Sequence, residues 1–208
     1  MNRSDRASEI LEMEISALNK LRGMLLNDET AISSFNSVID ALLGLNGKIV
    51  TIGIGKAGYI ARKAASTFCT TGSPSVFLHP GDASHGDVGI LGKDDAVLAF
   101  SNSGKNREVL ETVSFGRKLG ASLIISITSS ITSPLAEMSD HILCLGKLEE
   151  ACPLGFTPTS STTGMLALAD AIALVLMEER GFDHEAFSLR HHGGYLGEKS
   201  RREQARIK

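Results

Sequence analysis

The sequence predicts an α/β fold in which a five-stranded parallel sheet is covered by helices on both faces. Short apolar segments alternate with longer segments of helical periodicity, and most connections between them are short. The segment 96–100 (AVLAF) is apolar throughout, which is typical of a strand buried on both faces of a sheet. With no internal repeat and no low-complexity linker, we expect a single domain over residues 1–208, with a helical extension at residues 1–45.

Two helices are predicted ahead of the first strand. The first spans residues 4–26 and the second spans residues 28–43, with Asn27 and Asp28 as candidate caps where the second begins. Apolar residues recur at helical spacing in the first helix, at Ile10, Leu11, Ile15, Leu18, Leu21 and Leu25. These apolar stripes are wide enough to pack on the sheet or on a partner subunit.

The remaining elements alternate along the chain. Strands are expected at residues 48–52, 75–78, 96–100, 121–128 and 141–145, and helices from the turn 53–58 to about 71 and at 106–119, 133–138, 159–180 and 183–189. The sequence Gly72-Ser73-Pro74 ends the helix before the second strand, and Gly181 caps the long helix at residues 159–180. A polar loop is expected at residues 79–89.

Composition and charge exclude several classes of protein. The net charge is −3 and no long basic run precedes the C-terminus, so we expect no nucleic-acid partner. The basic segment 198–208 is explained as a solvated helix end or a frayed tail. No apolar stretch approaches the length of a membrane span and residues 1–10 lack the apolar centre of a signal peptide, so we expect no membrane association. Three scattered cysteines predict a reducing cytoplasm without structural disulfides, with Cys152 as a small buried residue.

A polar turn follows the apolar segment 96–100. Its residues are Ser101, Asn102, Ser103 and Gly104, and a helix-compatible run begins at Asn106. Backbone N–H groups and hydroxyls at the positive end of a helix form a site for a phosphate. The alternative is an ordinary strand-to-helix turn with a serine cap, and the turn by itself slightly favours that alternative.

The glycines of the turn 53–58 match the dinucleotide-binding pattern G-x-G-x-x-G. That fold also places an acid at the end of the second strand to hold the ribose, but here the strand ends in Leu78-His79-Pro80. Lys56, inside the turn, suits a sugar phosphate better than a nicotinamide cofactor, although a surface lysine beside a glycine turn is an alternative. We therefore expect no NAD and no other cofactor.

Two further segments are rich in polar side chains. The loop 79–89 carries two histidines and two aspartates without a spaced metal-ligand pattern, which indicates acid–base or hydroxyl-binding roles or a structural role. Glu149 and Glu150 follow the fifth strand, and six of the seven residues from Thr157 to Thr163 carry hydroxyls where the longest helix begins. Thr159 or Ser160 is the candidate cap, but capping does not explain so many hydroxyls.

Six blocks together resemble the sugar isomerase (SIS) family. They are GIGKAG at 53–58, HPGDASHGDVG at 79–89, SNSGKNRE at 101–108, EACPLG at 150–155, PTSSTT at 158–163 and HHGG at 191–194. They run in the family's order from about residue 48 to residue 197, and the second, fourth and fifth blocks are the specific ones. The resemblance implies a flavodoxin-like three-layer sandwich and an aldose–ketose isomerase that interconverts D-ribulose 5-phosphate and D-arabinose 5-phosphate.

The resemblance also implies the site residues. The catalytic set is Lys56, His85, Glu108, Glu150 and His191, and the substrate-binding set is Gly72, Ser73, His79, Ser101, Asn102, Ser103, Thr159, Ser160, Ser161 and Thr162. Zinc inhibits some members, and His79 is the residue expected to contact it. The family further implies a cytoplasmic homotetramer in which His191 reaches a neighbouring subunit's site, and a place in the supply of Kdo for lipopolysaccharide.

The chain departs from the family in two respects. A C-terminal pair of CBS domains is common in the family, and because the chain ends soon after residue 194 we expect none here. The family's His-Pro-Gly-Gly is His191-His192-Gly193-Gly194, and the missing proline loosens the turn that aims His191.

The expected reaction moves a proton between C1 and C2 through an enediol. Either Glu150 or Glu108 would be the carbon base, either His85 or His191 would assist ring opening or proton transfer between oxygens, and Lys56 would stabilise the enediolate. Two alternatives are a non-catalytic SIS module that binds a sugar phosphate and regulates a partner, and an SIS isomerase of another phosphosugar. The acids and histidines favour an enzyme over the regulatory module.

Overall fold

A computed structural model describes residues 2–207 and contains a five-stranded sheet in the order β2-β1-β3-β4-β5, with all neighbours parallel. The strands are β1 (Ile49–Gly53), β2 (Ser75–Leu78), β3 (Ala96–Phe100), β4 (Leu123–Thr128) and β5 (His141–Cys144). The helices are α1 (Arg3–Asn27), α2 (Glu29–Leu43), α3 (Gly55–Thr70), α4 (Pro80–Ala83), the 3-10 turn η1 (Asp87–Ile90), α5 (Arg107–Lys118), α6 (Pro134–Glu137), α7 (Ser160–Glu179), α8 (His184–Arg190) and α9 (Tyr195–Ile207). The predicted α/β class is confirmed.

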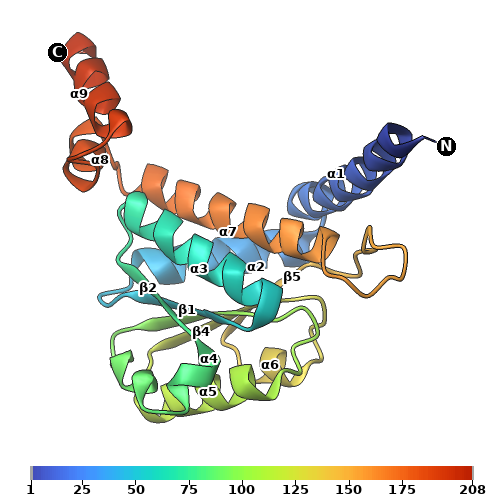
Figure 1. Ribbon diagram of the computed structural model, residues 1–208. Helices are drawn as coiled ribbons and strands as arrows, with labels where there is room; N and C mark the ends of the chain where they lie inside the picture. Colours follow the sequence, from blue (N-terminus) through green and yellow to red (C-terminus); the bar gives the residue numbers. More distant parts are fainter. Residues whose placement is uncertain (1, 208) are drawn as a thin grey trace.

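The sheet lies between two layers of helices, because its central strands are apolar on both faces. All five residues of β1 and of β3 are buried. One buried cluster joins the sheet to α2, α3 and α7, and the second joins its other face to α4, α5 and α6 (Figure 1). This three-layer arrangement sets the C-terminal ends of all the strands along one edge of the sheet.

Helix α1 packs on the body only through its C-terminal half. Ala17 and Leu21 are buried, whereas Leu11 is 61% exposed and Ile15 is 48% exposed. The N-terminal half of the helix extends away from the body (Figure 1). The predicted apolar stripe is therefore real but only partly covered within one chain.

Helices α8 and α9 form a hairpin that extends from the opposite side of the molecule (Figure 1). The basic segment forms most of α9, because Ser200 is buried and its hydroxyl donates to the His184 carbonyl at 2.9 Å. The prediction of a helix end or frayed tail thus missed a separate helix. The loop expected at 79–89 likewise contains the short elements α4 and η1.

Helix α7 crosses the body and connects its two ends. The expectation that no apolar stretch approaches the length of a membrane span was wrong for α7, which is long and apolar enough by length and composition alone. However, 50% of its most apolar stretch is buried, and the helix packs on α1, α2 and α3. The helix ends where Gly181 adopts φ +61° and donates its N–H to the Glu178 carbonyl, as predicted for a glycine cap. Its burial and packing are those of a core helix.

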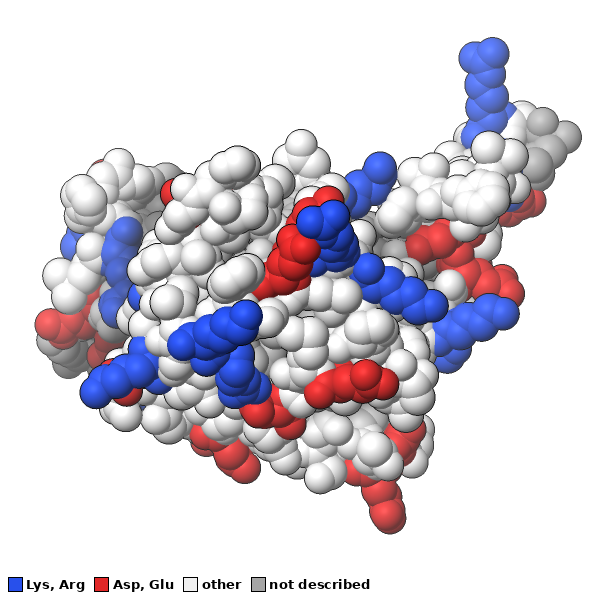
Figure 2. Space-filling view, turned by 90° about the horizontal axis from the view of Figure 1, so that it is seen from below, with Lys and Arg blue, Asp and Glu red and all other residues white. Residues whose placement is uncertain are grey.

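The face covered by α4, α5 and α6 carries acidic and basic side chains interspersed (Figure 2). Ion pairs such as Arg107–Glu111 and Arg117–Asp140 connect some of them. Neighbouring charges of opposite sign cancel at a distance, so this face gives no extended field of one sign.

Candidate active site

The candidate site lies where the strand order reverses. Strand β1 has β2 on one side and β3 on the other, and Gly53 at the end of β1 pairs with Phe100 at the end of β3. The loops that leave these two strands therefore start side by side and lead to helices on opposite faces of the sheet. In open α/β sheets such a switch point is where ligands bind. The turn with Lys56 and the turn with Ser101 both begin here.

The turn after β1 needs its glycines. Gly55 has φ +60°, and a Cβ on Gly58 would lie 2.7 Å from the Gly53 carbonyl oxygen. No side chain among residues 2–207 caps the start of α3, so its first N–H groups are left for a ligand. Lys56 is exposed in this first turn, and its ammonium adds positive charge to the helix end.

The turn after β3 is held in shape by Ser101. Its hydroxyl donates to Asn106 Oδ1 at 2.7 Å and accepts the Gly104 N–H at 3.1 Å. Gly104 has φ +63°, and a Cβ there would collide with Ser133. Ser101 therefore shapes the turn, while Asn102 and Ser103 are exposed at its surface.

The start of α5 is also open to an anion. Asn106 is its N-cap residue, but Ser101 occupies its side-chain oxygen, and within the described chain no side chain caps the helix. Glu108 lies exposed in the first helical turn. Two neighbouring helix N-termini, those of α3 and α5, thus offer unpaired N–H groups at the switch point.

Helix α7 differs from these two, because a carboxylate already occupies its N-terminus. Glu150 Oε2 accepts the Thr159 N–H at 2.7 Å, the Thr159 hydroxyl at 3.1 Å and the Ser161 N–H at 3.3 Å. The Ser160 and Ser161 hydroxyls are buried and have no hydrogen-bond partner in the described residues. Glu150 thus accepts two N–H groups at this helix end, and the substrate-binding role of Thr159, Ser160, Ser161 and Thr162 stays a prediction.

The hydrogen bonds at α7 decide the charge of Glu150. Burial by itself would raise the pKa of this carboxyl, but donors from Ser161 and Thr159 outweigh burial and hold the pKa below its ordinary value. The Ser161 N–H donates to Oε2 at 3.3 Å, and the Ser161 hydroxyl beside it also favours the ionised carboxylate. Glu150 is therefore ionised at neutral pH and is able to accept a proton.

The histidine loop stands beside the start of α3. His79 Nδ1 accepts the Gly81 N–H at 3.1 Å, which leaves the proton of the neutral ring on Nε2, a donor for a sugar hydroxyl. His85 is exposed between α4 and η1. Both follow β2 and so share the edge that carries Lys56.

A cavity of about 300 Å³ connects this loop to α3, and its walls include two residues that sequence reasoning missed. Tyr59 and Arg62 line it together with Gly55 and His79, and the Arg62 guanidinium lies 5.1 Å from the centre of the Phe77 ring. Gly55, Tyr59 and Arg62 recur at helical spacing on one face of α3, a signal that the sequence does contain.

Residues 2–207 contain no group of three or more His, Cys, Asp or Glu side chains placed to share an ion. His79 offers one ring nitrogen, and that nitrogen carries the proton. Zinc at His79 stays a prediction.

Cys152 does not match the expectation of a small buried residue. It is half-buried, and the Thr157 hydroxyl, with backbone N–H groups of residues 154, 156 and 157, lowers the pKa of its thiol to about 6. The prediction missed the loop that turns these donors onto the sulfur.

Three predicted residues lie at the opposite edge of the sheet. Gly72 and Ser73 precede β2, Phe182 covers Gly72, and buried Ser73 accepts a hydrogen bond from Arg180. His191 lies in the α8–α9 hairpin beyond the end of α7. The 20 residues of α7 correspond to about 30 Å, so none of the three reaches Glu150 of the same chain.

His191 is well fixed despite the missing proline. Its ring stacks on Phe187 at 4.1 Å between ring centres, and its Nδ1 lies 3.1 Å from the Phe187 carbonyl oxygen. Because a carbonyl only accepts, Nδ1 carries a proton and Nε2 is free to exchange one. The helix and the stacked ring thus replace the proline in holding this histidine.

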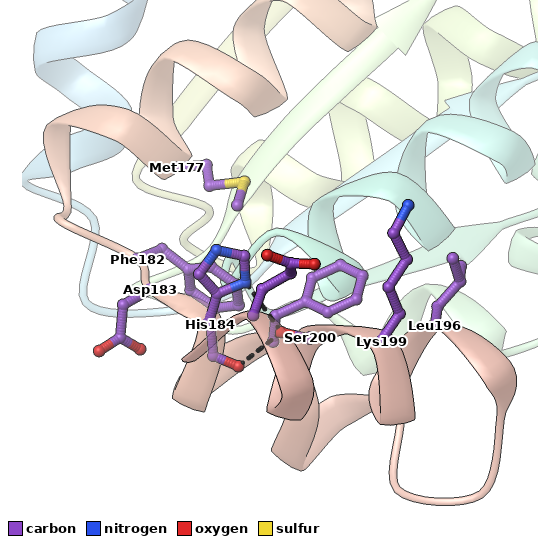
Figure 3. A pocket seen from close by; sticks show the side chains of 9 residues that line it. Met177, Phe182, Asp183, His184, Leu196, Lys199 and Ser200 are labelled. Carbon is purple, nitrogen blue, oxygen red and sulfur yellow. Dashed lines mark hydrogen bonds between the residues drawn. The ribbon is translucent and has the colours of Figure 1, made fainter. Parts of the chain in front are cut away.

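The hairpin around His191 has uncovered apolar surface. A pocket of about 350 Å³ opens between α8, α9 and the end of α7, lined by residues that include Met177, Phe182 and Leu196 (Figure 3). Leu189 and Tyr195, next to it in the chain, are 71% and 75% exposed. The pocket lies at the far end of α7 from Glu150.

The sequence matches the model of the SIS domain family over residues 43–175, and the chain belongs to this family. It is similar to curated proteins named arabinose 5-phosphate isomerase KdsD: it is 41% identical over 191 residues to the one from Yersinia pestis, and 42% over 191 residues to the one from Escherichia coli strain K12. Each comparison covers 92% of this chain and 56% of the relative, so the chain spans about half the length of these relatives.

Solved structures agree with the family assignment. The chain is similar to c3406 of E. coli CFT073 in complex with arabinose 5-phosphate, with a TM-score of 0.81 and 38% identity, over 92% of this chain and 100% of the other. A candidate phosphosugar isomerase involved in capsule formation from Bacteroides fragilis gives a TM-score of 0.84 and 41% identity, over 93% and 100% of the two chains.

Proposed function

We propose that the protein is an aldose–ketose isomerase that interconverts D-ribulose 5-phosphate and D-arabinose 5-phosphate. The observation that carries this proposal is the pair of uncapped helix N-termini at the switch point, together with an ionised carboxylate at the same edge of the sheet. The helix N-termini can bind a phosphate and stabilise a developing enediolate, and the carboxylate can remove a proton from carbon. The names of the similar isomerases and the sugar-phosphate complex of c3406 support this substrate.

Each part of the site has a separate role in the proposed reaction. The start of α5, with Asn102 and Ser103, holds the phosphate and thereby fixes the reacting carbons. Glu150 removes the proton at one carbon and returns it at the next. Lys56 and the N–H groups of α3 stabilise negative charge on the enediolate oxygen, an effect that is often the largest in such reactions. Glu108 and His85 are close in the fold to these elements and serve transfer between oxygens and ring opening.

A direct assay tests the function. Purified protein should interconvert ribulose 5-phosphate and arabinose 5-phosphate in excess EDTA and without added nicotinamide. Glucosamine 6-phosphate and fructose 6-phosphate, offered in parallel, should react at least about 100-fold more slowly in kcat/KM. A protein that binds phosphosugars but turns none of them over would instead be the regulatory kind of SIS module.

The phosphate site predicts the behaviour of Ser103→Ala. The exposed hydroxyl would contact the phosphate equally in ground and transition states, so KM should rise about tenfold while kcat stays within about twofold. Steady-state kinetics with ribulose 5-phosphate measure both constants. Ser122→Ala, at the opposite edge of the sheet, is the control that should keep both. An unchanged KM in Ser103→Ala would remove this residue from the phosphate site.

The exposed apolar surfaces of the chain bear on its assembly into an oligomer. We infer a homotetramer in the cytoplasm, and a place in the supply of Kdo for lipopolysaccharide or a related glycan. The exposed apolar residues of α1 and of the α8–α9 hairpin support an oligomer, as do Leu154 and Phe156 near Glu150, which are 78% and 86% exposed. Side chains this apolar at a functional edge favour contact with another subunit.

A further inference from the structure

The side chain of Thr159 makes two hydrogen bonds that together fix Glu150. Its hydroxyl donates to Glu150 Oε2 at 3.1 Å and accepts the N–H of Ala151, the next residue in the chain, at 2.8 Å. Its own N–H donates to the same carboxylate oxygen at 2.7 Å. Thr159 therefore holds both the carboxylate of Glu150 and the backbone beside it.

This arrangement reverses the usual capping of a helix. Thr159 is the N-cap residue of α7, yet its side chain makes no bond to its own helix. The carboxylate of Glu150, nine residues earlier, accepts the helix N–H groups instead. The long helix favours negative charge at this end, so the cap and the charge of Glu150 stabilise each other.

The three hydrogen bonds leave one side of the carboxylate open. All of them end on Oε2, and Oε1 has no hydrogen-bond partner in the part of the chain described here. A general base needs a free lone pair aimed at the substrate and a fixed orientation around it. Holding one oxygen while leaving the other free meets both needs.

We propose that Thr159 is a positioning residue that keeps Glu150 ionised and directs its free oxygen Oε1 towards the substrate carbon. This assignment rests on the proposed isomerase function. It differs from a substrate-binding role for Thr159, because the hydroxyl has both its donor and one acceptor position in use within the protein. The effect of Thr159 on the reaction is exerted through Glu150.

The sign of the expected pH effect follows from the hydrogen bonds. Burial raises the pKa of Glu150 and the donors lower it, so removing a donor moves the pKa up. The rate of isomerisation falls when Glu150 is protonated, so activity is lost on the acid side of the pH profile. A variant without the Thr159 hydroxyl should therefore lose activity at a higher pH than the wild type does.

The test is Thr159→Val, which removes the hydroxyl and retains the size, the β-branch and the backbone N–H. We expect kcat to fall roughly tenfold with KM nearly unchanged, and the acid limb of kcat/KM to move to higher pH. Thr159→Ser keeps a hydroxyl and should restore the wild-type profile. Thr163→Val, in the same turn of α7, loses a bond to Glu14 and should leave the acid limb in place.

A second readout does not need turnover. Carbon-13 NMR of the Glu150 carboxyl, assigned with Glu150→Gln, gives its titration midpoint in substrate-free protein, and Thr159→Val should raise it. If the midpoint rises in a protein that isomerises no phosphosugar, the proposed function is wrong but the hold of Thr159 on Glu150 stands.

The proposal is overturned if Thr159→Val folds and neither the midpoint nor the acid limb moves, even when kcat falls. Should that variant not fold, Thr159→Cys retains a weaker donor and should give a smaller shift in the same direction. An unshifted midpoint in a folded Thr159→Cys protein would overturn the proposal equally.

Discussion

Glu150→Gln should lower kcat for ribulose 5-phosphate by about 10²–10⁴-fold while phosphosugar binding changes only a few-fold. Glutamine keeps the shape of the side chain, and its amide oxygen still accepts the N–H groups at the start of α7. It has no basic oxygen to take a proton from carbon. Because the proposed phosphate contacts are on α5, the substrate should still bind.

Deuterium incorporation identifies the step that is lost. A proton held by a carboxylate exchanges with solvent during the lifetime of the enediol, so the wild type in D₂O should place deuterium at C2 of the aldose. Glu150→Gln should abolish this exchange. Glu149→Gln makes the same chemical change one residue away, on an exposed side chain, and should react at a rate within about twofold of wild type.

Two outcomes would contradict the assignment of the carbon base. One is Glu150→Gln retaining more than about a tenth of the wild-type kcat, which is too much for loss of a general base. The other is wild-type turnover with no solvent deuterium in the product. If Glu108→Gln abolishes exchange and Glu150→Gln does not, the base is the exposed acid of α5.

Much of the fold could be predicted because the strands are short apolar runs. The strands predicted at 75–78 and 96–100 match β2 and β3, because three apolar residues follow Ser75 in the first and the second is apolar throughout. The strand predicted from 121 begins at Leu123, because Ala121 and Ser122 form bonds to the end of α5 and to the loop before β3 instead. Helix α9 was missed because its stability comes from packing on α8, which its polar composition does not show.

The site could be predicted where it follows from strand ends. Residues that follow a strand, such as those of the turns 53–58 and 101–104, share one edge of a parallel sheet. The same rule places Gly72 and Ser73 at the other edge of the sheet, since they precede a strand. The order of the matching blocks along the sequence does not show at which edge of the sheet each residue lies. The capping of α7 by Glu150 could not be predicted, because it depends on how the loop between Glu150 and Thr159, nine positions apart, closes in three dimensions.

Because the predicted catalytic residues are far apart in one chain, we expect an active site that is shared between subunits. Lys56, Glu108 and Glu150 lie at one edge of the sheet, whereas His191 lies beyond the other end of α7, whose 20 residues correspond to a length of about 30 Å. A sugar phosphate is far shorter than this distance. If His191 acts in the reaction, it acts on a substrate held by another chain.

Mixing inactive variants tests this directly. His191→Ala supplies an intact Glu150, and Glu150→Gln supplies an intact His191, so exchanging subunits in equal amounts should restore about a quarter of wild-type activity if each site draws on two chains at random. Mixing Glu150→Gln with Lys56→Ala is the matched control, because both residues lie at the same edge of one chain and every site would keep a defect. Mixed oligomers of His191→Ala and Glu150→Gln, verified by native mass spectrometry, that stay inactive would show that His191 does not complete a neighbour's site. The exposed residues Leu189 and Tyr195 would then be expected to serve only in packing between subunits.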